Sequence, residues 1–313
     1  MKKLVLTALF SAAMLSSTAI YAKDIVIGVQ LFSFADKFQT YLQDEIRKFD
    51  NLHSDVTFRF ADANNDPARL LNDTETFIDQ KVDALLVVPT DQKIIKAIGR
   101  KAQRAGIPLI ILNRRPMPED MQYVASYVGS DEIEGGRIQG EFIAKAVNGK
   151  PVNSVILMGT LGLDATIART QGNKEVFAKH DNIHVLTEQE AKWDRAKGLE
   201  VAENLLAAYK TKGVNVIVSN NDEMAIGAVL ASRKLGIKDE DILIVGLDAT
   251  PDALEYLGNG LDATVYQSAV GQGAEGARIA YSAAKGENVP QIHYVPFELV
   301  TPDKKAEYQA KWH

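Results

Sequence analysis

The chain has 313 residues, of which 46% are hydrophobic and 24% charged, and its formal net charge is -6. This length is enough for two domains with separate cores, and an acidic chain without a basic run argues against nucleic acid as a partner. Because the sequence contains no cysteine, thiol catalysis, disulfides, zinc–thiolate sites and a lipidated N-terminal cysteine are excluded. The histidines show no metal-binding spacing, so neither a metal nor a cofactor is expected.

Residues 1–22 have the pattern of a signal peptide. Lys2 and Lys3 precede an apolar run over 4–15 that is too short to span a bilayer. Small residues follow, and cleavage is expected after Ala22. No later apolar run approaches the roughly 18 residues of a transmembrane helix. The sequence therefore predicts an exported protein of a bacterial periplasm.

After this segment, strands and helices alternate along the chain. Strands are expected at 25–30, 56–60, 84–88, 107–112 and 123–129, and helices at 37–49, 67–80, 92–105 and 132–147. The alternation restarts with strands at 154–158, 183–186, 214–218, 242–247, 263–266 and 295–300, and helices at 169–179, 194–208, 224–235 and 270–285. Repeated βα units predict parallel sheets with helices on both faces. Two such runs without a long linker predict the α/β class, with two doubly wound parallel-sheet domains.

Polar side chains follow neighbouring strands of the second run, at Asn221 and Asp248. The carboxyl ends of adjacent parallel strands meet at one edge, where open α/β sheets bind ligands. An amide beside a carboxylate offers donors and acceptors that suit hydroxyl groups. The alternative, equally open at this point, is that Asn221 only caps a helix and Asp248 only begins a turn. In the first series of strands and helices, Asn113 and Arg114 likewise follow the end of a strand. Two sheets that face each other would therefore line a cleft with all four residues.

In their order and spacing, several stretches resemble the periplasmic monosaccharide-binding proteins of ABC importers. Residues 193–199 and 221–228 are similar to the ribose branch of that family, and residues 28–38, 113–116 and 159–169 to the galactose/glucose branch. The resemblance covers essentially the whole chain after the signal. It implies a type I two-lobed fold in which three crossover strands join the lobes. The implied N-terminal lobe is 24–130 plus 268–296, and the C-terminal lobe is 131–267 plus 297–313.

The resemblance implies a binding protein, not an enzyme, that captures a cyclic polyol or sugar for a membrane permease and its ATPase. Carried over position by position, the ligand contacts are Asp36, Phe38, Asn113, Arg114, Arg169, Trp193, Asn221, Asp248 and Gln267. Phe38 and Trp193 would stack on opposite faces of a ring, and the polar side chains would bind the hydroxyls around its rim. The protein is expected to be a monomer. A second role, presentation of the loaded protein to a chemoreceptor, stays open.

Positions at which this sequence differs from both branches of the family help to identify the ligand. Leu163 and Ala165 stand where the galactose/glucose branch has a histidine and an aspartate, and Asp164 between them is expected to point differently. Residues 148–153 lack the alternating oxygen ligands of that branch's calcium loop. The ribose branch has Asp at 113 and Phe at 193, which this chain lacks. A six-membered cyclitol without an anomeric centre fits better, so myo-inositol is favoured over a pyranose hexose or ribose.

Other classes lack their signatures in this sequence. A dinucleotide-binding enzyme needs a Gly-x-Gly-x-x-Gly turn between a strand and a helix. The nearest approach, at 258–263, leads into a strand instead. The Gly-x-Ser-x-Gly motif of serine hydrolases is absent. Repressors with a similar two-lobed core need an N-terminal DNA-binding motif, where this chain has its export signal.

Overall fold

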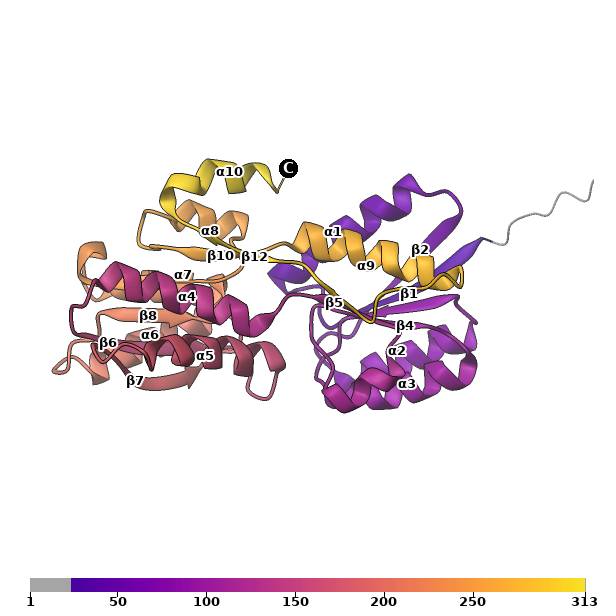
Figure 1. Cartoon of the computed structure of the whole chain (residues 1–313), viewed down its shortest axis with the longest axis horizontal. Helices are drawn as coiled ribbons and strands as arrows, with labels where there is room; N and C mark the ends of the chain where they lie inside the picture. Colours follow the sequence, from indigo (N-terminus) through magenta and orange to yellow (C-terminus); the bar gives the residue numbers. More distant parts are fainter. Residues whose placement is uncertain (1–23, 313) are drawn as a thin grey trace, which may run out of the picture.

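The computed structural model describes residues 24–312, so the export signal expected over residues 1–22 lies outside the described part. Two parallel sheets, each covered by helices on both faces, lie side by side and are joined by extended segments (Figure 1). The predicted α/β class is confirmed. Within residues 24–312, no helix is long and apolar enough to cross a membrane.

The first sheet is six-stranded and parallel, in the order β11-β5-β4-β3-β1-β2. Its strands are β1 (Ile25–Leu31), β2 (Val56–Asp62), β3 (Ala84–Val87), β4 (Leu109–Leu112), β5 (Ser126–Gly129) and β11 (Ile292–Tyr294). The nearly continuous β-branched and leucine runs of the central strands are typical of strands buried on both faces. Helices α1 (Lys37–Leu52) and α9 (Ala269–Ala284) pack on one face, and α2 (Pro67–Asp79) and α3 (Lys93–Ala105) on the other.

The second sheet is four-stranded and parallel, in the order β7-β6-β8-β9. Its strands are β6 (Val152–Met158), β7 (Ile183–Glu190), β8 (Val216–Ser219) and β9 (Leu243–Val245). Helices α4 (Glu132–Val147) and α5 (Asp164–Phe177) cover one face, and α6 (Arg195–Ala208) and α7 (Asp222–Lys234) the other. Beyond β9 lies an antiparallel pair, β10 (Thr264–Gln267) and β12 (Phe297–Val300). Along the chain, α8 (Pro251–Tyr256) lies between β9 and β10, and α10 (Lys305–Ala310) follows β12.

The chain passes between the two sheets three times, at 130–131, at Ser268 and at 295–296, and we call these segments the three passages. The strand predicted over 295–300 is present as β12, which begins two residues later because the third passage occupies 295–296. β11 was not predicted from the sequence. β11 pairs with β5 of the first sheet, and β12 pairs with β10 beside the second sheet. Pro296, which has no N–H to donate, lies at the break.

Trp312 contacts both halves of the molecule. Its ring centroid lies 4.5 Å from that of Tyr41 on α1, and its Nε1 donates to the carbonyl of Ala249 at 2.9 Å. It therefore packs on both sides of the interface between the two halves.

Glycines allow α4 and α5 to approach each other closely. A Cβ at Gly136 would overlap the carbonyl oxygen of Arg169, and a Cβ at Gly172 would overlap the carbonyl oxygen of Ile133. α5 also begins five residues earlier than predicted, at Asp164, because Leu163 already accepts the first helical hydrogen bond, from Ile167. Arg169 therefore lies in the second turn of α5, against the first turn of α4.

We expect Gly136→Ala to lower the free energy of unfolding by about 1–3 kcal/mol, because backbone atoms of a neighbouring helix must shift. The matched control is Gly276→Ala in the middle of α9, where the nearest atom is the flexible end of Leu112, 3.0 Å away. That change should fall within about 1 kcal/mol of the parent, since alanine has the higher helix propensity. Urea unfolding followed by circular dichroism measures both. Equal unfolding midpoints for the two variants would contradict the close helix contact.

Candidate functional site

A cavity of about 390 Å³ lies between the carboxyl ends of the two sheets, lined by side chains from both. Its lining includes every residue of the predicted contact set: Asp36, Phe38, Asn113, Arg114, Arg169, Trp193, Asn221, Asp248 and Gln267. The structure thus brings together residues that lie far apart in the sequence. Contact of these residues with a ligand stays a prediction.

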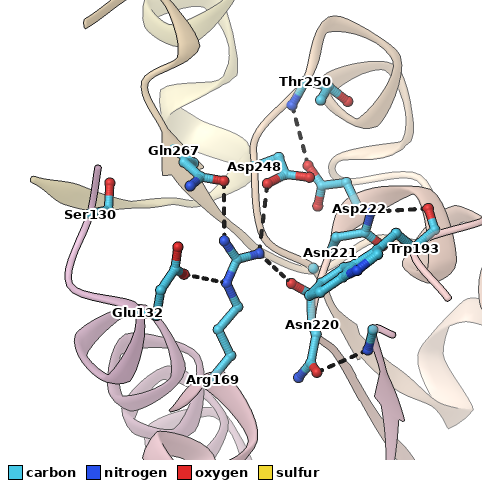
Figure 2. A network of polar contacts seen from close by, with 12 residues as sticks. Ser130, Glu132, Arg169, Trp193, Asn220, Asn221, Asp222, Asp248, Thr250 and Gln267 are labelled. Carbon is cyan, nitrogen blue, oxygen red and sulfur yellow. Dashed lines mark hydrogen bonds and ion pairs between the residues drawn. The ribbon is translucent and has the colours of Figure 1, made fainter. Parts of the chain in front are cut away.

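Arg169 is the centre of the polar network in the cavity (Figure 2). Its Nε donates to Oε2 of Glu132 at 2.6 Å, its Nη1 to the carbonyl of Asn220 at 2.7 Å, and its Nη2 to Oε1 of Gln267 at 3.2 Å. Oδ1 of Asp248 lies 3.9 Å from Nη1. Because Arg169 and Glu132 are each only 4% exposed, this is a buried ion pair reinforced by hydrogen bonds.

Two further carboxyl groups lie buried beside this network. Burial raises the pKa of Asp248 well above its usual value, although the Arg169 guanidinium opposes the shift. Burial raises the pKa of Asp222 to about 7, and its oxygens accept hydrogen bonds from the Thr264 hydroxyl and the Thr250 amide. Burial also raises the pKa of Glu132, against the effect of Arg169. The cavity therefore holds charged and polar groups away from water, where each hydrogen bond is stronger than in solvent.

Trp193 is held in a strained backbone conformation. It and Lys192 both have left-handed φ angles, 66° and 57°, which non-glycine residues adopt at a cost of about 1–3 kcal/mol each. The amide Nδ2 of Asn221 donates to the Trp193 carbonyl at 3.2 Å. The indole packs so closely on Gly159 that a Cβ there would overlap the ring. Strain at a cavity wall indicates a position that the surrounding structure fixes.

Asn221 and Asp248 follow β8 and β9, which are neighbouring parallel strands, so both lie at the same edge of the sheet as predicted. Asn221 also caps a helix, as the alternative interpretation expected, because its Oδ1 accepts from Met224 N at the start of α7. Asp248 has a φ of 134°, at the turn after β9. Both side chains nevertheless line the cavity, so a local structural role and a place in the cavity wall coexist at these positions.

On the first-sheet side, Asp36 caps α1 by accepting from Gln39 N at 3.1 Å. Burial raises the pKa of Asp36, against the effect of the nearby Arg114. Phe38, in the first turn of α1, is half-buried and packs partly on the first core. It leaves part of its ring toward the cavity.

Arg114 is fixed by its surroundings. Its Nη1 donates to the carbonyls of Pro89 and Thr90 at 2.9 and 2.7 Å, and its guanidinium lies 3.6 Å from the Phe32 ring centroid. Burial lowers the pKa of Arg114 to about 10, so it stays protonated at neutral pH. The preceding residue, Asn113, has a φ of 66° and donates from Nδ2 to Oε1 of Gln272 at 3.0 Å.

Three residues that line the cavity also carry buried polar atoms without a hydrogen-bond partner. Within the described residues, Nε2 of Gln267, Nε1 of Trp193 and Oε1 of Gln39 have no hydrogen-bond partner. An unpaired buried polar group costs about 1–3 kcal/mol, so such groups call for an explanation. Two donors and one acceptor in one cavity fit a ligand that carries several hydroxyl groups.

Sequence reasoning missed Gln39 and Glu132. An acidic residue in the first helical turn has the ordinary explanation of the helix dipole, so Glu132 gave no separate signal. Gln39 follows Asp36 at the spacing of residues on one helix face, and this spacing was the only signal in the sequence that Gln39 lines the cavity. Leu163, Asp164 and Ala165 all line the cavity as well. Over residues 24–312, no group of three or more His, Asp or Glu side chains could hold a metal ion.

Comparison with known proteins identifies clear relatives. Residues 27–288 match a family described as "Periplasmic binding protein domain". A protein of Rhizobium meliloti, named "Putative rhizopine-binding protein", is 37% identical over 317 residues, which cover 99% of this chain and 100% of that protein. A ribose import binding protein of Escherichia coli is 34% identical over 305 residues, 96% of this chain and 98% of that protein. The crystal structure of an ABC transporter solute-binding protein from Bacillus halodurans with bound myo-inositol matches with a TM-score of 0.87 and 40% identity, covering 93% of this chain and 99% of that chain.

Proposed function

The chain belongs to the periplasmic binding protein domain family, whose members are ligand-binding transport proteins and not enzymes, and on this premise we propose that its ligand is a cyclic polyol, with myo-inositol favoured. Its fold is that of type I periplasmic binding proteins, and it is the solute-binding protein of an ABC sugar importer. In this proposal the protein is exported to the periplasm as a monomer. It takes up its ligand in the cavity and delivers it to the permease and its ATPase.

The observation that carries the proposal is the set of unpaired buried donors and acceptors beside an aromatic wall. A cyclic polyol has C–H groups on its ring faces, which pack on Trp193 and Phe38, and hydroxyls on its rim, which pair with polar side chains. Arg169, Asp248 and Gln267 lie where rim hydroxyls would bind.

Myo-inositol is favoured over a sugar for two reasons. Leu163 and Ala165 form part of the cavity wall, and neither side chain can hydrogen-bond to the anomeric side of a hexose. The Bacillus halodurans neighbour, 40% identical, has myo-inositol bound. Ribose is the second candidate, because a ribose import binding protein is 34% identical over nearly the whole chain. A further role in presenting the loaded protein to a chemoreceptor belongs to the same binding function.

We also propose that binding closes two lobes over the ligand. The N-terminal lobe comprises 24–130 plus 268–296 and the C-terminal lobe 131–267 plus 297–313, with the three passages as hinge segments. Short extended connections of this kind permit the hinge closure that is general among periplasmic binding proteins.

Myo-inositol is expected to raise the melting temperature more than equal concentrations of galactose, glucose or ribose. Ligand that binds only the native state stabilises it by mass action. Each polar group left unpaired by a wrong stereoisomer lowers affinity by about 1–3 kcal/mol, or roughly five- to 150-fold. Differential scanning fluorimetry and calorimetry measure the two effects, and mass spectrometry of recovered ligand checks that it is unchanged. Strong stabilisation by galactose or glucose without an inositol effect would contradict the cyclitol assignment.

A further inference from the structure

Arg169 contacts one residue at each of the three passages. Glu132 directly follows the first passage and accepts from Nε at 2.6 Å. Gln267 directly precedes the second and accepts from Nη2 at 3.2 Å. Phe297 directly follows the third, with its ring centroid 5.8 Å from the guanidinium carbon. A single cavity side chain therefore lies against a residue next to each of the three passages.

The passages are also bonded to one another. The hydroxyl of Ser130 on the first passage donates to the carbonyl of Val295 on the third at 2.7 Å. Nε2 of Gln272, one turn beyond the second passage, donates to the same hydroxyl at 3.0 Å. The Oε1 of Gln272 accepts from Asn113, which lines the cavity. Movement at one passage therefore strains contacts at the others.

Glu132 makes the shortest of the contacts that the structure shows for the Arg169 guanidinium. Glu132, the Asn220 carbonyl and Gln267 each use one of its five N–H groups, which leaves one N–H on Nη1 and one on Nη2. Asp248, 3.9 Å away, attracts the guanidinium from the other side. The contact to Glu132 at 2.6 Å is shorter than the 3.9 Å contact to Asp248, and all three residues line the cavity.

We propose that Glu132 is a positioning residue: by fixing the Arg169 guanidinium for ligand, it couples occupation of the cavity to the three passages. This inference rests on the proposed binding function and deepens it. The close approach of α4 and α5 at Gly136 and Gly172 makes the contact possible. Glu132 lines the cavity, but its Oε2 is occupied by Nε of Arg169, so the proposed role is one that acts through Arg169.

The test replaces Glu132 by glutamine, which keeps the shape and removes the charge. Glu134→Gln is the matched control, since it removes a carboxylate from the same helical turn, where Glu134 is exposed and pairs only at 3.7 Å with Arg137. The probe is whichever of myo-inositol, galactose, glucose and ribose the parent protein binds most tightly. Calorimetry should show affinity about ten- to hundredfold weaker for Glu132→Gln and unchanged within about threefold for Glu134→Gln.

A double-mutant cycle separates positioning from general loosening of the fold. Lysine at 169 keeps the charge but cannot form the forked contact, so in an Arg169→Lys background Glu132→Gln should change affinity by less than about threefold. An equal loss in both backgrounds, or a loss no larger than that of Glu134→Gln, overturns the proposal. Should Glu132→Gln not fold, Glu132→Asp, which keeps the charge but withdraws it from Nε, is judged by the same outcomes.

A ligand-free measurement covers the case in which the parent binds none of the probes, which would refute the proposed function by itself. The Arg169 guanidinium lies 5.6 Å from the Trp193 ring, so its displacement alters the surroundings of that indole. In a Trp312→Phe background, Trp193 is the remaining tryptophan of the two. Acrylamide quenching that is stronger in Glu132→Gln than in Glu134→Gln supports positioning. Equal quenching overturns it.

Discussion

Arg169→Met is expected to destabilise the folded protein by about 3–5 kcal/mol, a large effect for a single substitution. The substitution leaves Glu132 as a buried carboxylate without its 2.6 Å partner and removes the cation nearest to Asp248. It also takes away the donors bound to the Asn220 carbonyl and to Gln267. Urea unfolding measures the loss.

The loss of folding stability in Arg169→Met should depend on pH. Burial already raises the folded-state pKa of Glu132 and Asp248, and Arg169 lowers it toward the usual range. Without Arg169 both values rise further above those of the unfolded chain, so the folded state binds more protons and gains stability as the pH falls. The deficit against the parent is therefore expected to be smaller near about pH 5 than near about pH 8.

A double variant distinguishes an unpaired charge from lost packing. Arg169→Met with Glu132→Leu removes both partners of the ion pair, and apolar replacement of a buried pair is often neutral for stability. The double variant should recover most of the stability that the single variant loses, but it should not recover ligand affinity. A double variant less stable than the single one would contradict the importance of the ion pair.

Trp193→Ala is expected to weaken ligand binding by about 2–4 kcal/mol, as for buried aromatic hot spots. The indole provides one wall of the cavity, and it is held there by the Asn221 bond to its carbonyl and by its packing on Gly159. Alanine would remove the ring surface and admit water. Calorimetry with the tightest-binding polyol measures the difference.

Trp193→Phe is the graded control, because it keeps an aromatic face but loses the indole N–H, which has no partner within the described residues. Its affinity loss should be smaller than that of the alanine variant. If the alanine variant binds as tightly as the parent, Trp193 is not a platform for the ring.

The arrangement of strands and four cavity-lining residues could be predicted from local signals, at Asn113, Arg114, Asn221 and Asp248. The other predicted contacts came from the resemblance to a known family. A polar residue that follows a buried strand lies at the edge of the sheet, which placed Asn221 and Asp248 at the same edge. Such local reasoning missed β11, because this strand has only three residues, Ile292–Tyr294, and is defined by its pairing with β5 of the first sheet. Which neighbour a strand takes is decided by distant residues.

The ion pair between Glu132 and Arg169 could not be predicted from the sequence for a related reason. It depends on the distance between two helix axes, which is set by Gly136 and Gly172. Glycine in a helix usually indicates lower helix propensity, and nothing in the local pattern indicates that two such residues face each other. A contact that depends on the missing side chain of a glycine is difficult to predict from sequence.

The packing of Trp193 on Gly159 also affects where one wall of the cavity lies. Because the indole occupies the space of any Cβ at 159, a side chain at that position would have to displace the ring. The size of residue 159 therefore sets how deep the indole can lie in the cavity wall. Enlarging residue 159 is a way to move this wall without changing any residue of the predicted contact set.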